Sequence, residues 1–210
     1  MGPETRRRTR MALVALAGAL SGGSAAAVAA DGATGPSSPP RPTAGFTARR
    51  LRPRSHAVAP GTIVRSSTLF GTRVFSDGRN GLALADVGQA QYPARTTDGG
   101  ARWRIDGPQL HVDAADGPEA VGSVGVASSR TLFAYGSSVV DVSTDAGRVW
   151  WETFLGGLVV AVVPGSGHSL LAYVQQSQSN AAVNPAVTWQ YVSRDGGRHW
   201  RYSTALGGIS

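Results

Sequence analysis

The sequence predicts an all-β fold made of short strands. Hydrophobic residues form 41% of the 210 residues, which is enough for a core, whereas 28 glycines and 12 prolines are too many for a helical bundle. A motif of the form S/T-x-D-x-G-x-x-W occurs three times, and its aspartates are 47 and then 50 residues apart. Repeated four-stranded units of about this length are typical of β-propellers. We therefore expect a partial β-propeller of about three four-stranded units.

Residues 1–30 are predicted to be an export signal. Four arginines lie in residues 1–10, residues 11–20 are apolar and uncharged, and small residues follow up to Ala30. This order is that of a secretory signal peptide, and cleavage is expected after Ala29 or Ala30. An uncleaved anchor is the alternative, because residues 11–30 carry no charge. The general secretory route is favoured over the twin-arginine route, and the protein is expected to be secreted or extracytoplasmic.

Residues 31–60 are predicted to be a disordered linker, because they contain six of the 12 prolines and little that can pack. Four arginines lie near the end of this segment, at Arg49, Arg50, Arg52 and Arg54. They are expected to form a hydrated basic tether. A weak contact of this arm with an anionic envelope surface is the alternative.

The net charge of +7 belongs to the N-terminal part of the chain. All 20 basic residues are arginines, and nine of them lie in the first 54 residues, where Glu4 and Asp31 are the acidic residues. The remaining 11 arginines are balanced by 11 acidic residues. A nucleic-acid partner is therefore not expected. The absence of cysteine excludes disulfides, cysteine-ligated metals and a thiol nucleophile.

The repeated motif, called the box below, lies within the predicted folded region, residues 61–210. In each box the aspartate is expected to accept backbone N–H bonds, and the glycine to adopt a positive φ. The serine or threonine hydroxyl bonds to the same turn, and the tryptophan is buried beneath it. Each box is thus predicted to close a hairpin and to leave no group for chemistry. The structural residues are Thr96, Asp98, Gly100, Trp103, Ser143, Asp145, Gly147, Trp150, Ser193, Asp195, Gly197 and Trp200.

Four short strands fit the spacing between boxes. Apolar triplets at 82–84, 133–135 and 171–173 are predicted second strands. First strands are expected at about 70–76, 121–126 and 158–163. A third strand leads into each aspartate, and a fourth carries the tryptophan. The polar stretch 175–185 is expected to be a loop.

The three boxes resemble the Asp-box, or BNR, repeat of sialidases, sortilin-type receptors and photosystem assembly and stability factors. The sequence at 75–77, followed by 81–83 and 95–100, is most similar to the stability-factor-like group. The resemblance covers about residues 62–206. It implies propeller blades with the boxes at the hairpins between third and fourth strands, away from the ligand face.

A sialidase-like glycoside hydrolase, or an inactive glycan-binding relative, is the alternative function that the resemblance implies. Such enzymes need a Tyr and Glu pair, an acid/base Asp and an arginine cluster, opened by an F/Y-R-I-P motif. That motif is absent, and Glu119 and Glu152 are the glutamates that follow the signal. A calcium site in the loop holding Asp113, Asp116 and Glu119 is not favoured, because alternating oxygen ligands are lacking. We expect no catalytic residue, no cofactor and no metal.

Three units leave the outer faces of the first and last units in need of cover, including the apolar run 158–163. We expect either two copies that close into a six-bladed ring or docking on another protein. A truncated gene product is the remaining alternative. The expected function is that of an exported, non-catalytic binding or assembly module, whose protein or glycan ligand the sequence does not name.

Overall fold

The computed structural model describes residues 45–52, 58–88, 90–110, 122–175 and 187–206, which all belong to the unit Arg41–Ser210. The predicted signal peptide lies outside the described residues. Within them, every regular element is a β-strand except one 3-10 helix, η1 (Ser66–Thr68). No helix of this part of the chain has the length and apolar character needed to cross a membrane.

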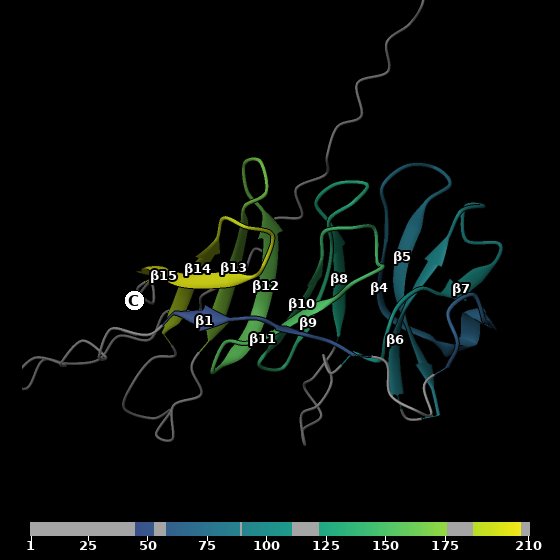
Figure 1. Cartoon of the computed structure of the whole chain (residues 1–210), viewed down its shortest axis with the longest axis horizontal. Helices are drawn as coiled ribbons and strands as arrows, with labels where there is room; N and C mark the ends of the chain where they lie inside the picture. Colours follow the sequence, from purple (N-terminus) through teal and green to yellow (C-terminus); the bar gives the residue numbers. More distant parts are fainter. Residues whose placement is uncertain (1–44, 53–57, 89, 111–121, 176–186, 207–210) are drawn as a thin grey trace, which may run out of the picture. The chain divides into compact units, whose positions relative to one another are not determined.

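The strands form three antiparallel sheets of five strands each (Figure 1). The order in the first sheet is β3 (Ile63–Val64), β7 (Trp103–Ile105), β6 (Ala90–Thr96), β5 (Gly81–Val87) and β4 (Leu69–Phe75). In the second it is β2 (Arg49–Arg50), β11 (Trp151–Phe154), β10 (Val139–Ser143), β9 (Leu132–Gly136) and β8 (Ser123–Val126). In the third it is β1 (Phe46–Thr47), β15 (His199–Leu206), β14 (Thr188–Ser193), β13 (Leu170–Gln175) and β12 (Leu158–Pro164). The all-β prediction is confirmed, and three such sheets fit a β-propeller-like fold.

Four strands of each sheet follow one another in the chain, and they lie close to the predicted ranges. The predicted second-strand triplets fall on β5, β9 and β13. The boxes connect β6 to β7, β10 to β11 and β14 to β15. One detail differs, because Trp150 lies one residue before β11, whereas Trp103 and Trp200 lie within their strands.

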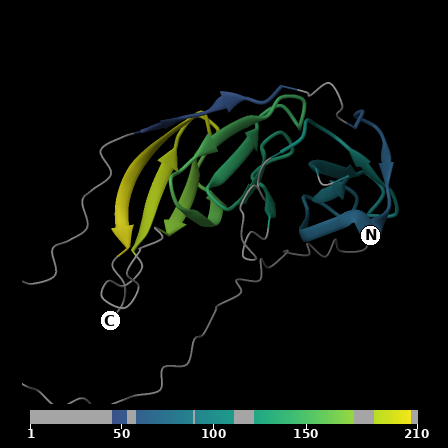
Figure 2. The same ribbon diagram turned by 90° about the horizontal axis from the view of Figure 1, so that it is seen from below.

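The fifth strand of every sheet comes from a segment that we call the strap, residues 45–52 and 58–64. β1 pairs with β15, β2 with β11 and β3 with β7, so the strap contacts the third sheet first and the first sheet last. The prediction of a disordered linker over residues 31–60 is therefore wrong for 45–52 and 58–60. In Figure 2 the strap, in blue, runs across the outer edges of the third and second sheets. The rest of the predicted linker, 31–44 and 53–57, lies outside the described residues.

The outer strands of the sheets explain why the strap is ordered. An edge strand exposes unpaired N–H and C=O groups, and an added strand pairs them. The strap also places an apolar residue beside each box tryptophan. Phe46 is registered with Trp200 and Val64 with Trp103, and the Leu51 N–H donates to the Trp150 carbonyl at 2.9 Å.

The second sheet packs against both of its neighbours through buried apolar side chains. Between the first and second sheets, the buried cluster consists of Leu82, Leu84, Leu110, Val124, Leu132, Ala134, Val139 and Trp150. Between the second and third sheets, Phe133, Val140 and Val142 pack with residues of β12, β13 and β14, and with Trp200. The tryptophans of the second and third boxes therefore lie in the cores between sheets. Burial of this kind is the main favourable contribution to folding.

Candidate functional site

The first box forms a closed set of hydrogen bonds between β6 and β7. The Thr96 hydroxyl donates to Asp98 Oδ1 at 2.8 Å and accepts the Gly100 N–H at 2.9 Å. Asp98 Oδ1 also accepts the Arg102 N–H at 2.9 Å. The Trp103 indole N–H donates to the Gly100 carbonyl at 3.1 Å, and its ring is buried. The polar side chains of this box therefore bond to their own turn, where such bonds hold a tight hairpin.

The same four bonds recur in the other two boxes. Taken in the same order, they measure 2.9, 2.8, 2.9 and 2.9 Å in the second box. In the third box they measure 2.9, 2.8, 3.0 and 3.0 Å. The box glycines have φ values of 93°, 93° and 86° at Gly100, Gly147 and Gly197, a region that residues with a β-carbon rarely adopt. All twelve predicted box residues thus lie in three equivalent hairpins.

The box carboxylates are held in their charged form. The pKa of Asp98 is lowered mainly by the backbone N–H four residues later and the hydroxyl two residues earlier. Burial raises the pKa of Asp145, but the equivalent two bonds outweigh it and the pKa is lowered. For Asp195 burial is again outweighed, here by the side chain and backbone of His199 and the Ser193 hydroxyl, so its pKa is about 2. Such carboxylates stabilise their hairpins and are not tuned as general acids near neutral pH.

The second box also contacts the first sheet. Gly147 lies against Asp106, where an added β-carbon would approach the Asp106 carbonyl oxygen to 3.2 Å. Arg95 Nη1 lies 3.0 Å from Asp106 Oδ2 and donates to the Ala146 carbonyl at 2.9 Å. The turn of the second box therefore contacts the ion pair between Arg95, on β6, and Asp106, which follows β7. Hydrogen bonds to charged donors are stronger than neutral ones.

The third box contacts the second sheet in the equivalent place. Gly197 lies against Val142, where an added β-carbon would overlap the Val142 methyl group and come within 2.7 Å of its Cβ. The Arg198 guanidinium lies over the Trp151 ring, with its carbon 4.6 Å from the ring centroid. Such a cation–π contact favours this arrangement. The residue before the box serine and the residue after the box tryptophan thus form the contact surface for the next box.

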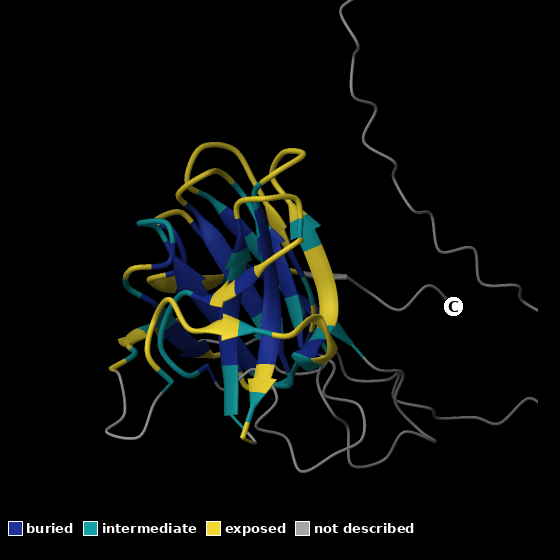
Figure 3. Cartoon of the chain, turned by 90° about the vertical axis from the view of Figure 1, so that its right-hand side faces the viewer, coloured by how far each residue is buried: buried dark blue, intermediate teal, exposed yellow. Residues whose placement is uncertain are grey.

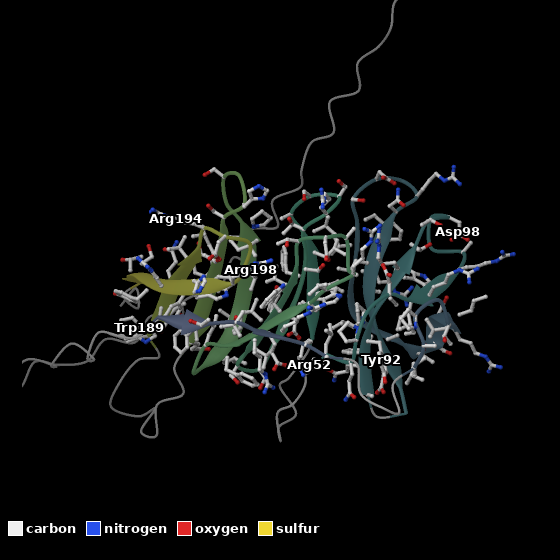
Figure 4. All side chains as sticks on the ribbon, viewed as in Figure 1. Arg52, Tyr92, Asp98, Trp189, Arg194 and Arg198 are labelled. Carbon is white, nitrogen blue, oxygen red and sulfur yellow. The ribbon has the colours of Figure 1, made fainter. Side chains whose placement is uncertain are left out.

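Cavities lie at this same place on the first and third sheets. On the third sheet the cavity measures about 540 Å³, and on the first about 380 Å³. Seven residues line the third-sheet cavity, and the residues 97 positions before them all line the first-sheet cavity. Asp195 and Asp98 are one such pair. Figure 4 shows Arg194 and Asp98 at opposite ends of the row of sheets. The third-sheet lining consists of Val192, Arg194, Asp195, His199, Arg201, Tyr202 and Ser203.

Glu152, the described glutamate that we considered for hydrolysis, is buried in the second sheet. Its side chain is 0% exposed and accepts a hydrogen bond from Arg49 Nε at 2.6 Å. Arg49 also lies over the Phe154 ring, with its carbon 5.3 Å from the ring centroid. The carboxylate therefore fastens the strap to β11. Arg49 is thus bonded into the fold although its side chain is 65% exposed, Arg50 and Arg52 are also exposed, and Arg54 lies outside the described residues.

The acidic loop that the sequence singles out, with Asp113, Asp116 and Glu119, lies outside the described residues. Within the described ranges, no group of three or more His, Cys, Asp or Glu side chains is placed to hold a metal ion. Among the histidines, His199 bonds to its own box through Nδ1, 2.6 Å from Asp195 Oδ2. The backbone carbonyl of His168 accepts a hydrogen bond from the Gly196 N–H at 3.1 Å.

The strongest candidate for a binding surface is the free face of the third sheet, which we define as Val163, Leu171, Tyr173, Val192 and Arg201. Val163 is 37% exposed, and the next three are partly buried. These residues face away from the second sheet, because their strand neighbours Val162, Leu170, Ala172 and Val174 lie in the core between the second and third sheets. Sequence reasoning identifies the apolar run 158–163, but the strand register decides which of its residues are exposed.

Comparison of the chain with protein-family models, with curated proteins and with solved structures found no match. The functional argument therefore rests on the residues and contacts described above.

Proposed function

We propose that this chain is an exported, non-catalytic binding or assembly module, a partial β-propeller whose three sheets are Asp-box blades. The blade interpretation is supported by three boxes with the same four bonds, each at the hairpin between the third and fourth strands of its unit. It is also supported by the way each following box contacts the preceding sheet at one equivalent place. Repeats that cover one another's faces in this way are the principle of propeller construction.

The observation that carries the binding role is the free face of the third sheet. The equivalent apolar residues of the first two sheets are buried beneath the sheets that follow them. On the third sheet, apolar side chains at Val163, Leu171 and Val192 remain accessible. Exposed apolar surface of this kind marks a protein-binding site more often than an enzyme centre. The hydrolase alternative gains nothing from Glu152, which is buried against Arg49.

The binding role is tested by placing a photo-activated cross-linking amino acid at Val163 in cells that naturally produce the chain. A cross-linked species from Val163 is expected, whatever its partner. The matched control is Ile63, which is more exposed, at 59%, but lies on the strap in the first sheet. Equal labelling from the two positions, or no adduct from Val163, would contradict the binding role. Export is tested separately by N-terminal sequencing of the secreted protein, which is expected to start at Ala30 or Asp31.

A further inference from the structure

Each sheet contains an equivalent strip of four residues that lie side by side on successive strands. The strip includes the residue before the box serine or threonine and the residue after the box tryptophan. Strand register places these four residues on one face of the sheet. The strips are Val74, Leu82, Arg95 and Arg104 in the first sheet, Gly125, Phe133, Val142 and Trp151 in the second, and Val163, Leu171, Val192 and Arg201 in the third.

The apolar centres of the first two strips are buried beneath the sheet that follows, and that of the third is not. Leu82 is 1% exposed beneath the second sheet, and Phe133 and Val142 are 3% and 0% exposed beneath the third. Their counterparts Leu171 and Val192 are partly exposed. The same types of side chain thus differ in exposure because the third sheet has no following sheet within the described residues.

The opposite end of the row of sheets is closed by the chain itself. On the far face of the first sheet, Ala83, Ala85 and Ala94 are 0% exposed, and Val58 and Val64 of the strap pack against this cluster. The Tyr92 hydroxyl accepts the Val58 N–H at 3.2 Å. Figure 3 views the molecule from this side and shows exposed segments in front of buried strands. The first sheet therefore has no open apolar face equivalent to that of the third.

We propose that two copies of this chain associate through the free faces of their third sheets, related by a two-fold axis. This inference rests on the proposed binding role and names its partner. Within the described ranges a copy of the chain has one uncovered apolar sheet face, so a second copy offers the same face. Identical faces that meet in this way form an isologous, closed dimer, the commonest assembly of identical chains. A six-bladed ring instead requires the first sheet to receive the third, and the strap covers that surface.

The charges around the free face agree with contact between two copies. Its apolar part consists of Val163, Leu171, Tyr173 and Val192 on β12, β13 and β14, and its one charged member, Arg201, is exposed on β15. Exposed charges of both signs, Arg194 and Asp195, lie at the rim beside the cavity. Arg201 lies on β15, beyond Val192, so the apolar residues on β12, β13 and β14 can meet without a charge between them, and charges at a rim are screened by water.

The proposal is tested first by sedimentation equilibrium of the processed protein at micromolar concentrations. A dimer is expected for the natural sequence. Val163→Arg is expected to weaken the dimer at least about 30-fold, because it places a charge in the apolar part of the free face. Because Val163 is already 37% exposed, this variant is expected to fold, and circular dichroism checks that it does. Ile63→Arg is the matched control and is expected to remain a dimer.

A cysteine experiment distinguishes the two-fold contact from a ring. The natural chain has no cysteine, so every disulfide must come from introduced residues. Val163→Cys alone is expected to form a disulfide dimer on mild oxidation. Cross-linking only when Phe75→Cys of the first sheet is also present would overturn the proposal in favour of a ring. A monomeric natural protein would overturn it as well, and a hetero-adduct from Val163 in cells would then leave the binding role in place with another partner.

Discussion

The contact between each box and the preceding sheet predicts different effects for two equivalent glycine substitutions. Gly100 and Gly197 occupy the same position in the first and third boxes, with φ values of 93° and 86°. An alanine at either position therefore meets the same backbone strain, roughly 1–2 kcal/mol for a left-handed residue. Alanine also lowers the conformational entropy of the unfolded chain, which offsets about 0.4–1 kcal/mol of this strain. Backbone effects alone thus predict a loss of about 1 kcal/mol in the free energy of unfolding for both variants.

The surroundings of the two β-carbons differ. At Gly100 the nearest atoms belong to Phe75 and Trp103 of the same sheet, at 3.5 and 3.7 Å, which are ordinary contacts. At Gly197 the added carbon overlaps Val142 of the second sheet, within 2.7 Å of its Cβ. Overpacking of a tight contact costs about 1–3 kcal/mol. We therefore expect Gly197→Ala to lose about 2–4 kcal/mol in total. Gly147→Ala, whose carbon would lie 3.2 Å from Asp106, should fall between the two.

Urea unfolding followed by tryptophan fluorescence measures these losses, because the box tryptophans report on the hairpins that are perturbed. The difference between Gly197→Ala and Gly100→Ala isolates the contact between sheets, since the strain common to both cancels. Equal losses in the two variants would refute the reasoning. A larger loss for Gly100→Ala would show that the first box, and not the contact between sheets, limits stability.

Three further outcomes are expected. Ala146 has a φ of 64° where the other boxes have glycine, so Ala146→Gly should raise the free energy of unfolding by about 0.5–1 kcal/mol in a urea titration. Arg49→Met removes the hydrogen bond and ion pair between Arg49 and the buried Glu152 carboxylate and should lower the melting temperature, with a loss of about 1–3 kcal/mol, and adding Glu152→Gln should restore part of it. Because the pKa of Asp195 is about 2 when folded against 3.8 for a free carboxyl, its contribution is complete above pH 3.8 and lost as the pH falls through about 2. Asp195→Asn should flatten this part of the acid-unfolding curve, and an unchanged curve would contradict the assignment.

The box hairpins could be predicted in detail because all of their interacting groups lie within eight residues of one another. The hydroxyl of Ser143, the carboxylate of Asp145 and the turn at Gly147 are joined by local bonds. Local residue preferences for turns capture such bonds directly. The positions of the first strands were predicted from apolar runs upstream of each box, although the distance from first strand to box aspartate differs between the repeats.

The strap could not be predicted, because its partners are distant in the sequence and its composition is that of a linker. Arg49 bonds to Glu152 across a separation of 103 residues. The cover on the far face of the first sheet was missed for the same reason. We expected both outer faces to be open, and this is wrong for the first sheet, where Val58 and Val64 pack over the apolar cluster.

The order in which the strap meets the sheets sets the order of folding. Phe46, near the start of the described chain, is registered with Trp200, near its end. β1 therefore has no partner until residues 199–200 have been synthesised, and closing so long a loop slows folding. Each repeat can form its hairpin locally as soon as it emerges, whereas β1 of the strap must wait for β15 of the third sheet. We therefore expect β1, the first strand of the described chain, to be the last to find its partner and so to complete the fold.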